Sequence, residues 1–306
     1  MTDVRFHRCM RWTLAAITVA TTVAIGAPQS RAAEPSRILS VGGAVTEILY
    51  DLGVADRIVA VDSTSLYPPE ALKTHKNVGY LRALSTEGVL SVAPDVIIAS
   101  DKAGPPEVVR ALKASGIEYF EVNDDPSPEA LIARVRAVAG KVGKAAMGED
   151  LVKRIEKGFA DLAAARKVLA RAPSALFVLS IQGGRATIGG TETTADVMLK
   201  LAGATNAASS LKGFKPISEE SIIAMDPEAI IIMSRTGGHG VGSDVLNLPG
   251  VAATRAGLDR RVIEMDGLLL MGFGPRAPEA ATDLMQALQK PAQGGAAAPK
   301  APGSKG

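Results

Sequence analysis

Unbroken apolar runs alternate with segments of helical period along most of the chain. The runs lie at 37–41, 58–61, 94–100, 175–179, 227–234 and 262–265, and those at 94–100 and 227–234 open with a proline turn. Such runs are typical of parallel strands that are covered by helices on both faces of a sheet. Because strands and helices alternate, the pattern predicts an α/β fold.

The pattern occurs twice. In the first half, Gly42-Gly43 leads into an amphipathic segment that stops at Gly53, and in the second half Gly189-Gly190-Thr191 leads into one that stops at Gly203. A glycine-rich turn before a helix and a glycine after it are ordinary helix boundaries. Their repetition predicts two related lobes.

A second pair of segments follows in the same order. Leu84-Ser85-Thr86-Glu87 and Ile217-Ser218-Glu219-Glu220 each begin a helix with a serine cap, and each helix is followed by a proline turn and an apolar strand. Glu87 precedes Pro94 by the same spacing as Glu220 precedes Pro227. Two matching segments in the same order support two Rossmann-like α/β lobes.

Between the lobes lies a long stretch of helical pattern. Ser127-Pro128 is a good helix start, with a cap and then proline at the first helical position, and Pro173 marks the end. We therefore expect an N-terminal lobe at 33–126, a single long backbone helix at 127–172 and a C-terminal lobe at 173–290, although Gly140, Gly143 and Gly148 are places where that helix can be interrupted. Lobes joined in this way cannot swing freely, so a site between them should be largely preformed.

The two ends of the chain lie outside this pattern. Arg5, Arg8 and Arg11 precede an apolar run, and Ser30-Arg31-Ala32 follows it. These features predict a cleaved signal peptide at 1–32 and a periplasmic protein, because the run is too short to span a membrane. Residues 291–306 are rich in Ala, Gly, Pro and Lys, which predicts a disordered tail.

Composition excludes several classes of function. The net charge is +2, and the charges are mixed along the chain, so nothing indicates nucleic-acid binding. The one cysteine, Cys9, falls in the predicted signal peptide, which leaves no disulfide or thiolate site afterwards. His75 and His239 are the histidines that remain after cleavage, too few for a three-histidine zinc site. Gly272-Phe273-Gly274-Pro275 does not make a dinucleotide fingerprint, so an exported enzyme becomes a weak alternative.

Ligands of open α/β sheets bind beyond the carboxyl ends of the strands. The loops expected there are 42–46, 63–82, 102–106, 182–191, 234–243 and 266–276. Tyr80 lies in one of them, and a tyrosine phenolate is a hard oxygen ligand that suits ferric haem iron. Arg82, two residues on, can donate a hydrogen bond that favours the phenolate. The residues alone nevertheless favour a simpler interpretation, in which the Tyr80 ring packs against the protein and its hydroxyl group lies in solvent.

The chain resembles the periplasmic haemin-binding proteins of bacterial haem ABC importers, within the class that also binds cobalamin and siderophores. The segments that carry the resemblance are 77–90, with its Gly-Tyr-x-Arg-x-Leu-Ser-x-Glu-Gly pattern, Gly189-Gly190-Thr191, and Gly272-Phe273-Gly274-Pro275-Arg276. It runs from about Arg37 to Gln289. It implies haem as the transported ligand and an inner-membrane permease with its ATPase as the partner.

The resemblance implies roles for Tyr80 as axial ligand of the iron and Arg82 as its partner. Arg185, Arg235 and Arg276 lie in expected cleft loops and are candidates for the haem propionates, because arginine suits carboxylates. Many relatives have a histidine near Ile181–Arg185, where this chain has Gln182 and Arg185. His239 is either a sixth iron ligand or a solvated residue of a glycine-rich loop.

Glu87 and Glu220 are expected to dock the protein on its permease. Each opens a helix at an equivalent place in its half, and related importers are thought to use such a pair. Simple complementation of the helix dipole is an equally good explanation from the sequence, and Glu219 replaces Glu220 if the register slips by one. A ferric siderophore or cobalamin remains the alternative ligand. Siderophore sites need several basic residues and cobalamin sites favour aromatic walls, whereas the only tryptophan lies in the predicted signal peptide.

Overall fold

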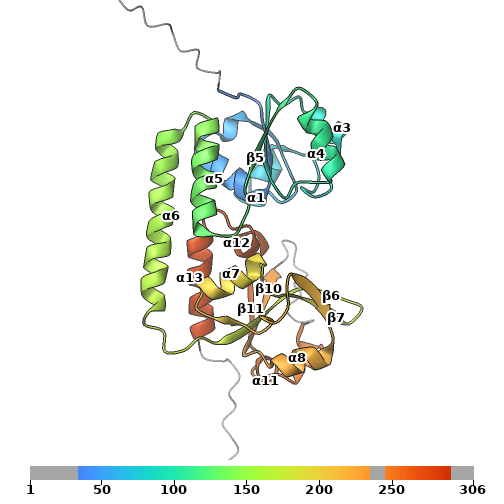
Figure 1. Ribbon diagram of the computed structural model, residues 1–306, viewed down its shortest axis with the longest axis vertical. Coiled ribbons are helices and arrows are strands. Elements are labelled where there is room, and N and C mark those ends of the chain that lie inside the picture. Colours follow the sequence, from blue (N-terminus) through green and yellow to red (C-terminus); the bar gives the residue numbers. More distant parts are fainter. Residues whose placement is uncertain (1–33, 235–244, 291–306) are drawn as a thin grey trace, which may run out of the picture. The chain divides into compact units, whose positions relative to one another are not determined.

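The N-terminal lobe is built on a parallel sheet with helices on both sides (Figure 1). The computed structural model describes residues 34–234 and 245–290. The strands are β1 (Ile38–Val41), β2 (Ile58–Val61), β3 (Lys76–Asn77), β4 (Val96–Ser100) and β5 (Glu118–Val122), in the order β3-β2-β1-β4-β5. β1 and β4 are buried along their whole length, as expected for central parallel strands covered on both faces.

The helices of this lobe are α1 (Gly43–Asp51), the 3-10 turn η1 (Ala55–Arg57), α2 (Ala71–Thr74), α3 (Thr86–Leu90) and α4 (Pro106–Lys113). Ser85 caps α3 as the sequence predicted, because its hydroxyl accepts a hydrogen bond from the backbone N–H of Gly88 at 3.0 Å. The apolar runs predicted as strands at 37–41, 58–61 and 94–100 are confirmed.

The predicted helix at 127–172 is two helices, α5 (Pro128–Lys141) and α6 (Ala145–Arg166). The chain reverses at Gly143, whose φ of +73° ends the first helix in a left-handed turn that suits glycine. Figure 1 shows α6 running beside α5 and then beside α13 (Ala277–Gln289) of the C-terminal lobe. The single long backbone helix is therefore α6, and α5 belongs to the N-terminal lobe, where it packs on α1.

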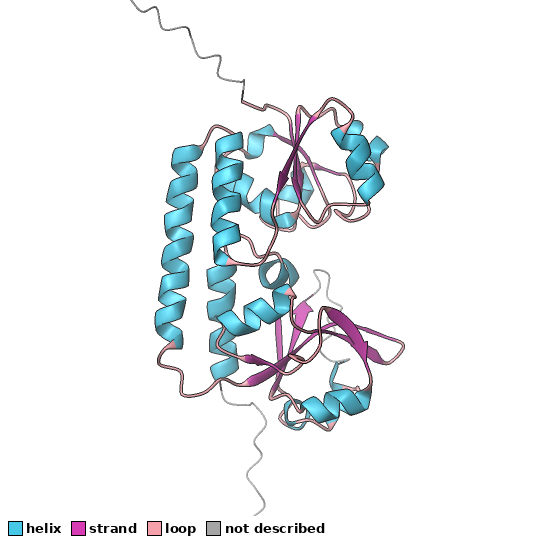
Figure 2. Ribbon diagram, in the orientation of Figure 1, coloured by secondary structure: helices cyan, strands magenta, loops and turns pink. Residues whose placement is uncertain are grey.

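The C-terminal lobe has a mixed sheet (Figure 2). Its strands are β6 (Ser174–Gln182), β7 (Arg185–Gly189), β8 (Thr205–Asn206), β9 (Phe214–Ile217), β10 (Ala229–Ser234) and β11 (Val262–Asp266). β6, β10 and β11 are parallel, as their apolar runs predicted. β7 is antiparallel to β6 and β9, because Gly183 and Gly184, with φ of +55° and +75°, make the tight turn of a hairpin that the sequence pattern did not predict.

The remaining helices are α7 (Thr194–Leu201), α8 (Glu219–Met225), α10 (Pro249–Ala252), α11 (Arg255–Leu258) and α12 (Gly267–Met271). α7 follows its glycine-rich turn as α1 does, and Ser218 caps α8 as Ser85 caps α3. The internal repeat predicted from the sequence is therefore present in the fold.

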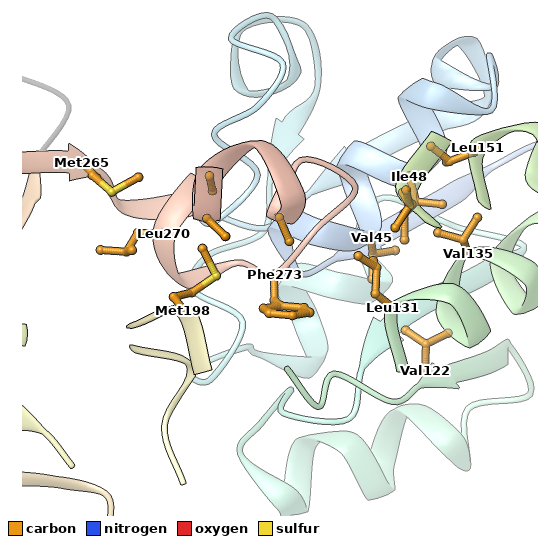
Figure 3. Packing of buried hydrophobic residues seen from close by; sticks show 14 of the residues in the cluster. Val45, Ile48, Val122, Leu131, Val135, Leu151, Met198, Met265, Leu270 and Phe273 are labelled. Atoms are coloured by element: carbon orange, nitrogen blue, oxygen red, sulfur yellow. The ribbon is translucent and has the colours of Figure 1, made fainter. Parts of the chain in front are cut away.

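One apolar cluster continues from lobe to lobe (Figure 3). It includes Val45 of α1, Leu131 of α5, Met198 of α7 and Leu270 of α12. Phe273 lies among them, 1% exposed, and stacks on Phe159 of α6 with 6.4 Å between ring centroids. Because the lobes share this core, separating them would expose buried apolar surface, and the limited swinging expected from the sequence stays a prediction.

Three predictions concern residues that the structure does not describe. The signal peptide at 1–32 and the tail at 291–306 lie outside the described ranges, and so does most of the predicted cleft loop 234–243. Within the described ranges, no helix has both the length and the apolar character needed to cross a bilayer.

Candidate functional site

A cleft with a volume of about 630 Å³ lies at the carboxyl ends of the strands, where the fold predicts a ligand. Five of the six loops expected there contribute lining residues from both lobes, namely 42–46, 63–82, 102–106, 266–276 and, through its first residue Ser234, 234–243. The volume falls within the range of small-molecule and cofactor sites. Loop 182–191 contributes none of the lining residues.

Tyr80 lies on the cleft wall in a loop that is held at several points. Val78, Leu81 and Leu84 on either side of it are at most 9% exposed, whereas Tyr80 itself is 47% exposed. The backbone N–H of Ser63 donates to the carbonyl of Gly79 at 2.8 Å, and Ala83 N–H donates to the carbonyl of Tyr80 at the same distance. These anchors on both sides of Tyr80 fix the backbone that carries the exposed phenol.

Two cations line the same wall. Arg82 is exposed and two residues from Tyr80. Lys102, which the sequence reasoning did not single out, lies with its Nζ 3.2 Å from Asp101 and 3.5 Å from Asp125. Partial burial acts to lower the pKa of Lys102, but these two carboxylates raise it overall, so the ammonium stays charged.

Asp124 also lines the cleft and is the acidic member of its wall. Its carboxylate pairs with Arg134 at 2.9 Å and accepts a hydrogen bond from Ser100 at 3.0 Å. Burial raises the pKa of Asp124, and the Arg134 guanidinium acts in the opposite direction. Arg134, whose side chain is fully buried, also donates to the carbonyl of Phe273 at 3.2 Å, which ties α5 to the C-terminal lobe.

A buried carboxylate organises the floor of the cleft. Asp62 accepts hydrogen bonds from the backbone N–H groups of Gly42 and Thr64 at 2.8 and 2.9 Å and from the hydroxyl of Ser65 at 3.2 Å. Because the first of these groups precedes α1 and the others follow β2, Asp62 holds two lining loops together. A buried carboxylate with this many donors is well satisfied and is structural.

Gly43 lies where the two lobes meet at this floor. A Cβ at this position would lie 2.4 Å from the carbonyl oxygen of Thr64 in the same lobe and 2.5 Å from Cδ1 of Leu268 in the other lobe. The Leu268 side chain can turn aside, but the backbone carbonyl of Thr64 cannot, so the contact with Thr64 is the one that requires a glycine here. The requirement explains part of the Gly42-Gly43 motif seen in the sequence.

The wall contributed by the C-terminal lobe is mainly apolar. It consists of Leu179 on β6, Phe214 on β9, Met233 on β10, and Leu268 and Met271 on α12. Leu179, Phe214, Met233 and, on the other wall, Asp124 were missed by the sequence reasoning. Strand residues inside an apolar run or at the start of an unexpected strand give no local sign that they face a cleft.

Arg276 lies outside this cleft, although its loop was expected to face it. Its guanidinium makes two hydrogen bonds to the carboxylate of Glu47, both at 3.0 Å, and lies 3.5 Å from the ring centre of Tyr67. Glu47 is 3% exposed. Burial raises the pKa of Glu47, while the hydrogen bonds and charge of Arg276 act to lower it. Arg276 thus joins α13 to the N-terminal lobe, and its guanidinium is already engaged.

The other predicted residues are scattered. Arg185 is exposed at the start of β7 and does not line the cleft. Arg235 and His239 lie outside the described residues. Glu87 and Glu220 are both exposed, each as the second residue of its helix, and a hydrogen bond with Ser218 lowers the pKa of Glu220. In the described part of the chain, no group of three or more His, Cys, Asp or Glu side chains is arranged to hold a metal ion.

Comparison with known proteins places the chain in a family. The family model described as periplasmic binding protein matches residues 38–268, so the chain belongs to the periplasmic binding protein family. A curated relative, an uncharacterized ABC transporter substrate-binding lipoprotein of Bacillus subtilis, is 26% identical and covers 83% of this chain and 80% of its own length. A vitamin B12-binding protein of Photorhabdus laumondii is 24% identical over 65% of this chain and 71% of its own length.

Solved structures support the same placement. The periplasmic heme-binding protein RhuT of Roseiflexus is 36% identical, with a TM-score of 0.78 over 83% of this chain and 97% of that one. The periplasmic heme-binding protein HutB of Vibrio cholerae is 33% identical, with a TM-score of 0.74 over 83% and 99%. The two-lobed α/β fold and the resemblance predicted from the motifs are confirmed.

Proposed function

We propose that this chain is a periplasmic haem-binding protein that captures haem in the cleft and delivers it to an inner-membrane ABC importer. The observation that carries the proposal is Tyr80, an exposed phenol held at both ends of its loop on the cleft wall. A phenolate is a suitable ligand for ferric haem iron. Solved relatives that are named heme-binding proteins share this fold at up to 36% identity.

The remainder of the cleft suits an amphipathic ligand. Haem has an apolar ring and two propionates, and the cleft has an apolar wall from one lobe and cations from the other. We propose that Tyr80 binds the iron, that Arg82 favours the phenolate by a charge-assisted hydrogen bond, and that Lys102 is better placed for a propionate than Arg185 or Arg276. Arg235 and His239 stay predictions.

A haemin titration followed by absorbance tests the proposal. The wild-type protein should take up haemin with the spectrum of a ferric tyrosinate complex. Tyr80→Phe keeps the ring and removes the ligand oxygen, so it should abolish that spectrum and weaken haemin binding by roughly a hundredfold or more, equivalent to about 3 kcal/mol. Tyr119→Phe is the matched control, because Tyr119 lies on β5 and does not line the cleft.

Cobalamin is the alternative ligand, and its support is the vitamin B12-binding relatives. The same titration with cyanocobalamin separates the two. Uptake of cobalamin without haemin, or a wild-type haemin spectrum that survives Tyr80→Phe, would contradict the haem proposal. Export through a cleaved signal peptide is tested separately by sequencing the amino terminus of the protein recovered from the periplasm, which should begin after Ala32.

A further inference from the structure

Phe214 is a large aromatic side chain that the C-terminal lobe leaves on the cleft wall. It is 38% exposed, and it faces the same cavity as Tyr80, which comes from the other lobe and is 47% exposed. Among the described lining residues these two are the aromatic ones. An exposed aromatic ring inside a concave site, rather than on a convex surface, indicates contact with a ligand.

The ring of Phe214 is seated by residues that are themselves buried. It packs edge-on against Phe177 of β6, with 6.4 Å between centroids and 62° between ring planes, and Phe177 is 1% exposed. A Cβ at Gly189 would lie 3.3 Å from the Phe214 ring and 3.2 Å from the Phe177 ring. Gly189 therefore leaves the space in which the two rings meet.

The neighbouring glycine holds the same region together. A Cβ at Gly190 would lie 2.3 Å from the carbonyl oxygen of Leu211, a distance that no side chain tolerates. The backbone N–H of Gly190 donates to the carbonyl of Gly213, the residue before Phe214, at 3.0 Å. The glycines at the end of β7 therefore do more than precede α7. Gly189 allows the close approach to the Phe214 ring, and Gly190 holds the backbone at Gly213, the residue before it.

Tyr80 and Phe214 also occupy related places in the repeated pattern. Tyr80 lies five residues before Ser85, the cap of α3, and Phe214 lies four residues before Ser218, the cap of α8. Each half therefore presents one aromatic side chain to the shared cleft from the segment that precedes its capped helix. The first can ligate a metal through oxygen, and the second offers only the face or edge of a ring.

We propose that Phe214 is a specificity-determining residue that contacts the porphyrin ring itself and selects flat aromatic macrocycles independently of the metal. The proposal rests on the proposed haem function and deepens it by dividing recognition between the lobes. Tyr80 of the N-terminal lobe recognises iron, and Phe214 of the C-terminal lobe recognises the macrocycle by aromatic stacking and apolar burial.

Titration with haemin and with metal-free protoporphyrin IX tests this division. Phe214→Ala should weaken both ligands by a similar factor, about tenfold, whereas Tyr80→Phe should weaken haemin far more than the metal-free ring. Phe214→Tyr, which keeps the ring, should bind both nearly as wild type. Leu258→Ala is the matched control, because Leu258 is 72% exposed and lies outside the cleft.

Thermal unfolding of each variant shows whether it is folded, and Phe214→Leu provides a second variant that keeps apolar volume without the ring. Phe214→Leu should bind both ligands with an affinity between those of wild type and Phe214→Ala. If Phe214→Ala is folded and binds both ligands like the wild type, the inference about Phe214 is wrong and the proposed haem function still stands. A loss confined to haemin also overturns the inference, because the residue would then act through the iron. If the wild-type protein binds neither porphyrin, the proposed function fails and the inference fails with it.

Discussion

The two halves of the chain share one framework but present different chemistry to their common cleft. Each half has a glycine-rich turn before a helix, then a serine-capped helix and a buried strand. The N-terminal half places Tyr80, Arg82 and Lys102 on the wall, and the C-terminal half places Phe214 and methionines there. The helices and strands are therefore repeated in the two halves, whereas the side chains that face the cleft differ.

The length of one connection accounts for much of this difference. In the N-terminal half, seven residues separate the end of β3 at Asn77 from the cap Ser85, and this loop carries Tyr80 and Arg82. In the C-terminal half, β9 ends at Ile217 and Ser218 follows directly, so the equivalent segment stays in the sheet. A loop anchored by buried residues can carry polar groups into a site, and functional residues lie on such loops disproportionately often.

The strongest test of equivalence between the halves concerns Glu87 and Glu220. Both are exposed second residues of their capped helices, so the register favours Glu220 over Glu219 as the partner of Glu87. If each lobe docks one side of a permease, Glu87→Ala with Glu220→Ala should abolish stimulation of its ATPase in the reconstituted importer and leave haemin affinity unchanged.

The two single variants sharpen this test. Equivalent lobes should give similar partial losses, and a loss from one variant only would show that docking is one-sided. Glu107→Ala is the control, because Glu107 is an exposed acid in the first turn of another helix of the same lobe. Normal stimulation by the double variant would mean that another surface docks.

A buried ion pair and an exposed one should contribute unequally to the stability of the protein. Glu47→Ala removes the partner of the half-buried Arg276 and should lower the free energy of unfolding by about 3 kcal/mol. Arg154→Ala breaks the ion pair between Arg154 and Asp51. Because the Arg154 side chain is 67% exposed, this change should lower the free energy of unfolding by less than about 1 kcal/mol. Denaturant unfolding of both variants measures the difference, and equal losses would contradict the assignment of Glu47 as a buried tie.

The pKa of Glu47 gives this tie a pH dependence. Because burial raises that pKa above its ordinary value of 4.5, the folded protein holds the proton more tightly than the unfolded chain. The contribution of this group to stability is full below pH 4.5 and is lost as pH rises through the raised pKa. Glu47→Gln cannot ionise, so its stability relative to wild type should increase as pH rises above 4.5 through the raised pKa. A relative decrease over that range would contradict this assignment.

A smaller effect is expected from Arg82. Arg82→Ala should leave haemin bound but loosen it by about tenfold, the value of one hydrogen bond to a charged group. It should also move the formation of the ferric tyrosinate spectrum to higher pH, which an absorbance titration measures. Arg185→Ala, outside the cleft, should change neither property. An unchanged pH profile for Arg82→Ala would show that Arg82 does not favour the Tyr80 phenolate.

The smallest effect compares the two caps. Ser85→Ala and Ser218→Ala each remove a side-chain acceptor from a backbone N–H and should each lower stability by about 1 kcal/mol. Asp at either position keeps an acceptor and should restore most of the loss. Clearly unequal losses of stability would show that one serine cap stabilises the protein more than the other.

The sequence predicts features that depend on neighbours along the chain. Buried strands such as β4 and caps such as Ser85 follow from local pattern, and the family motif draws attention to Tyr80. The break at Gly143 was visible only as one of three candidate glycines. The β6–β7 hairpin was not predicted, because Gly183-Gly184 was assigned to a cleft loop rather than to a two-residue turn between strands.

Arg276 shows what local reasoning cannot supply. Its loop was correctly expected near the cleft, and its guanidinium suits carboxylates. The carboxylate that it binds belongs to Glu47, 229 residues away and buried. Lys102 and Phe214 were missed for the same reason, since their positions on the cleft wall come from tertiary packing.

Gly43 makes the junction of the two lobes sensitive to a single methyl group. The Thr64 carbonyl oxygen of the same lobe and the Leu268 side chain of the other lobe both lie in the space that a Cβ on residue 43 would occupy. A leucine side chain can turn aside, but a backbone carbonyl moves only with its loop. An alanine at position 43 would therefore displace the loop after β2, which carries Ser63 and Thr64 of the cleft wall.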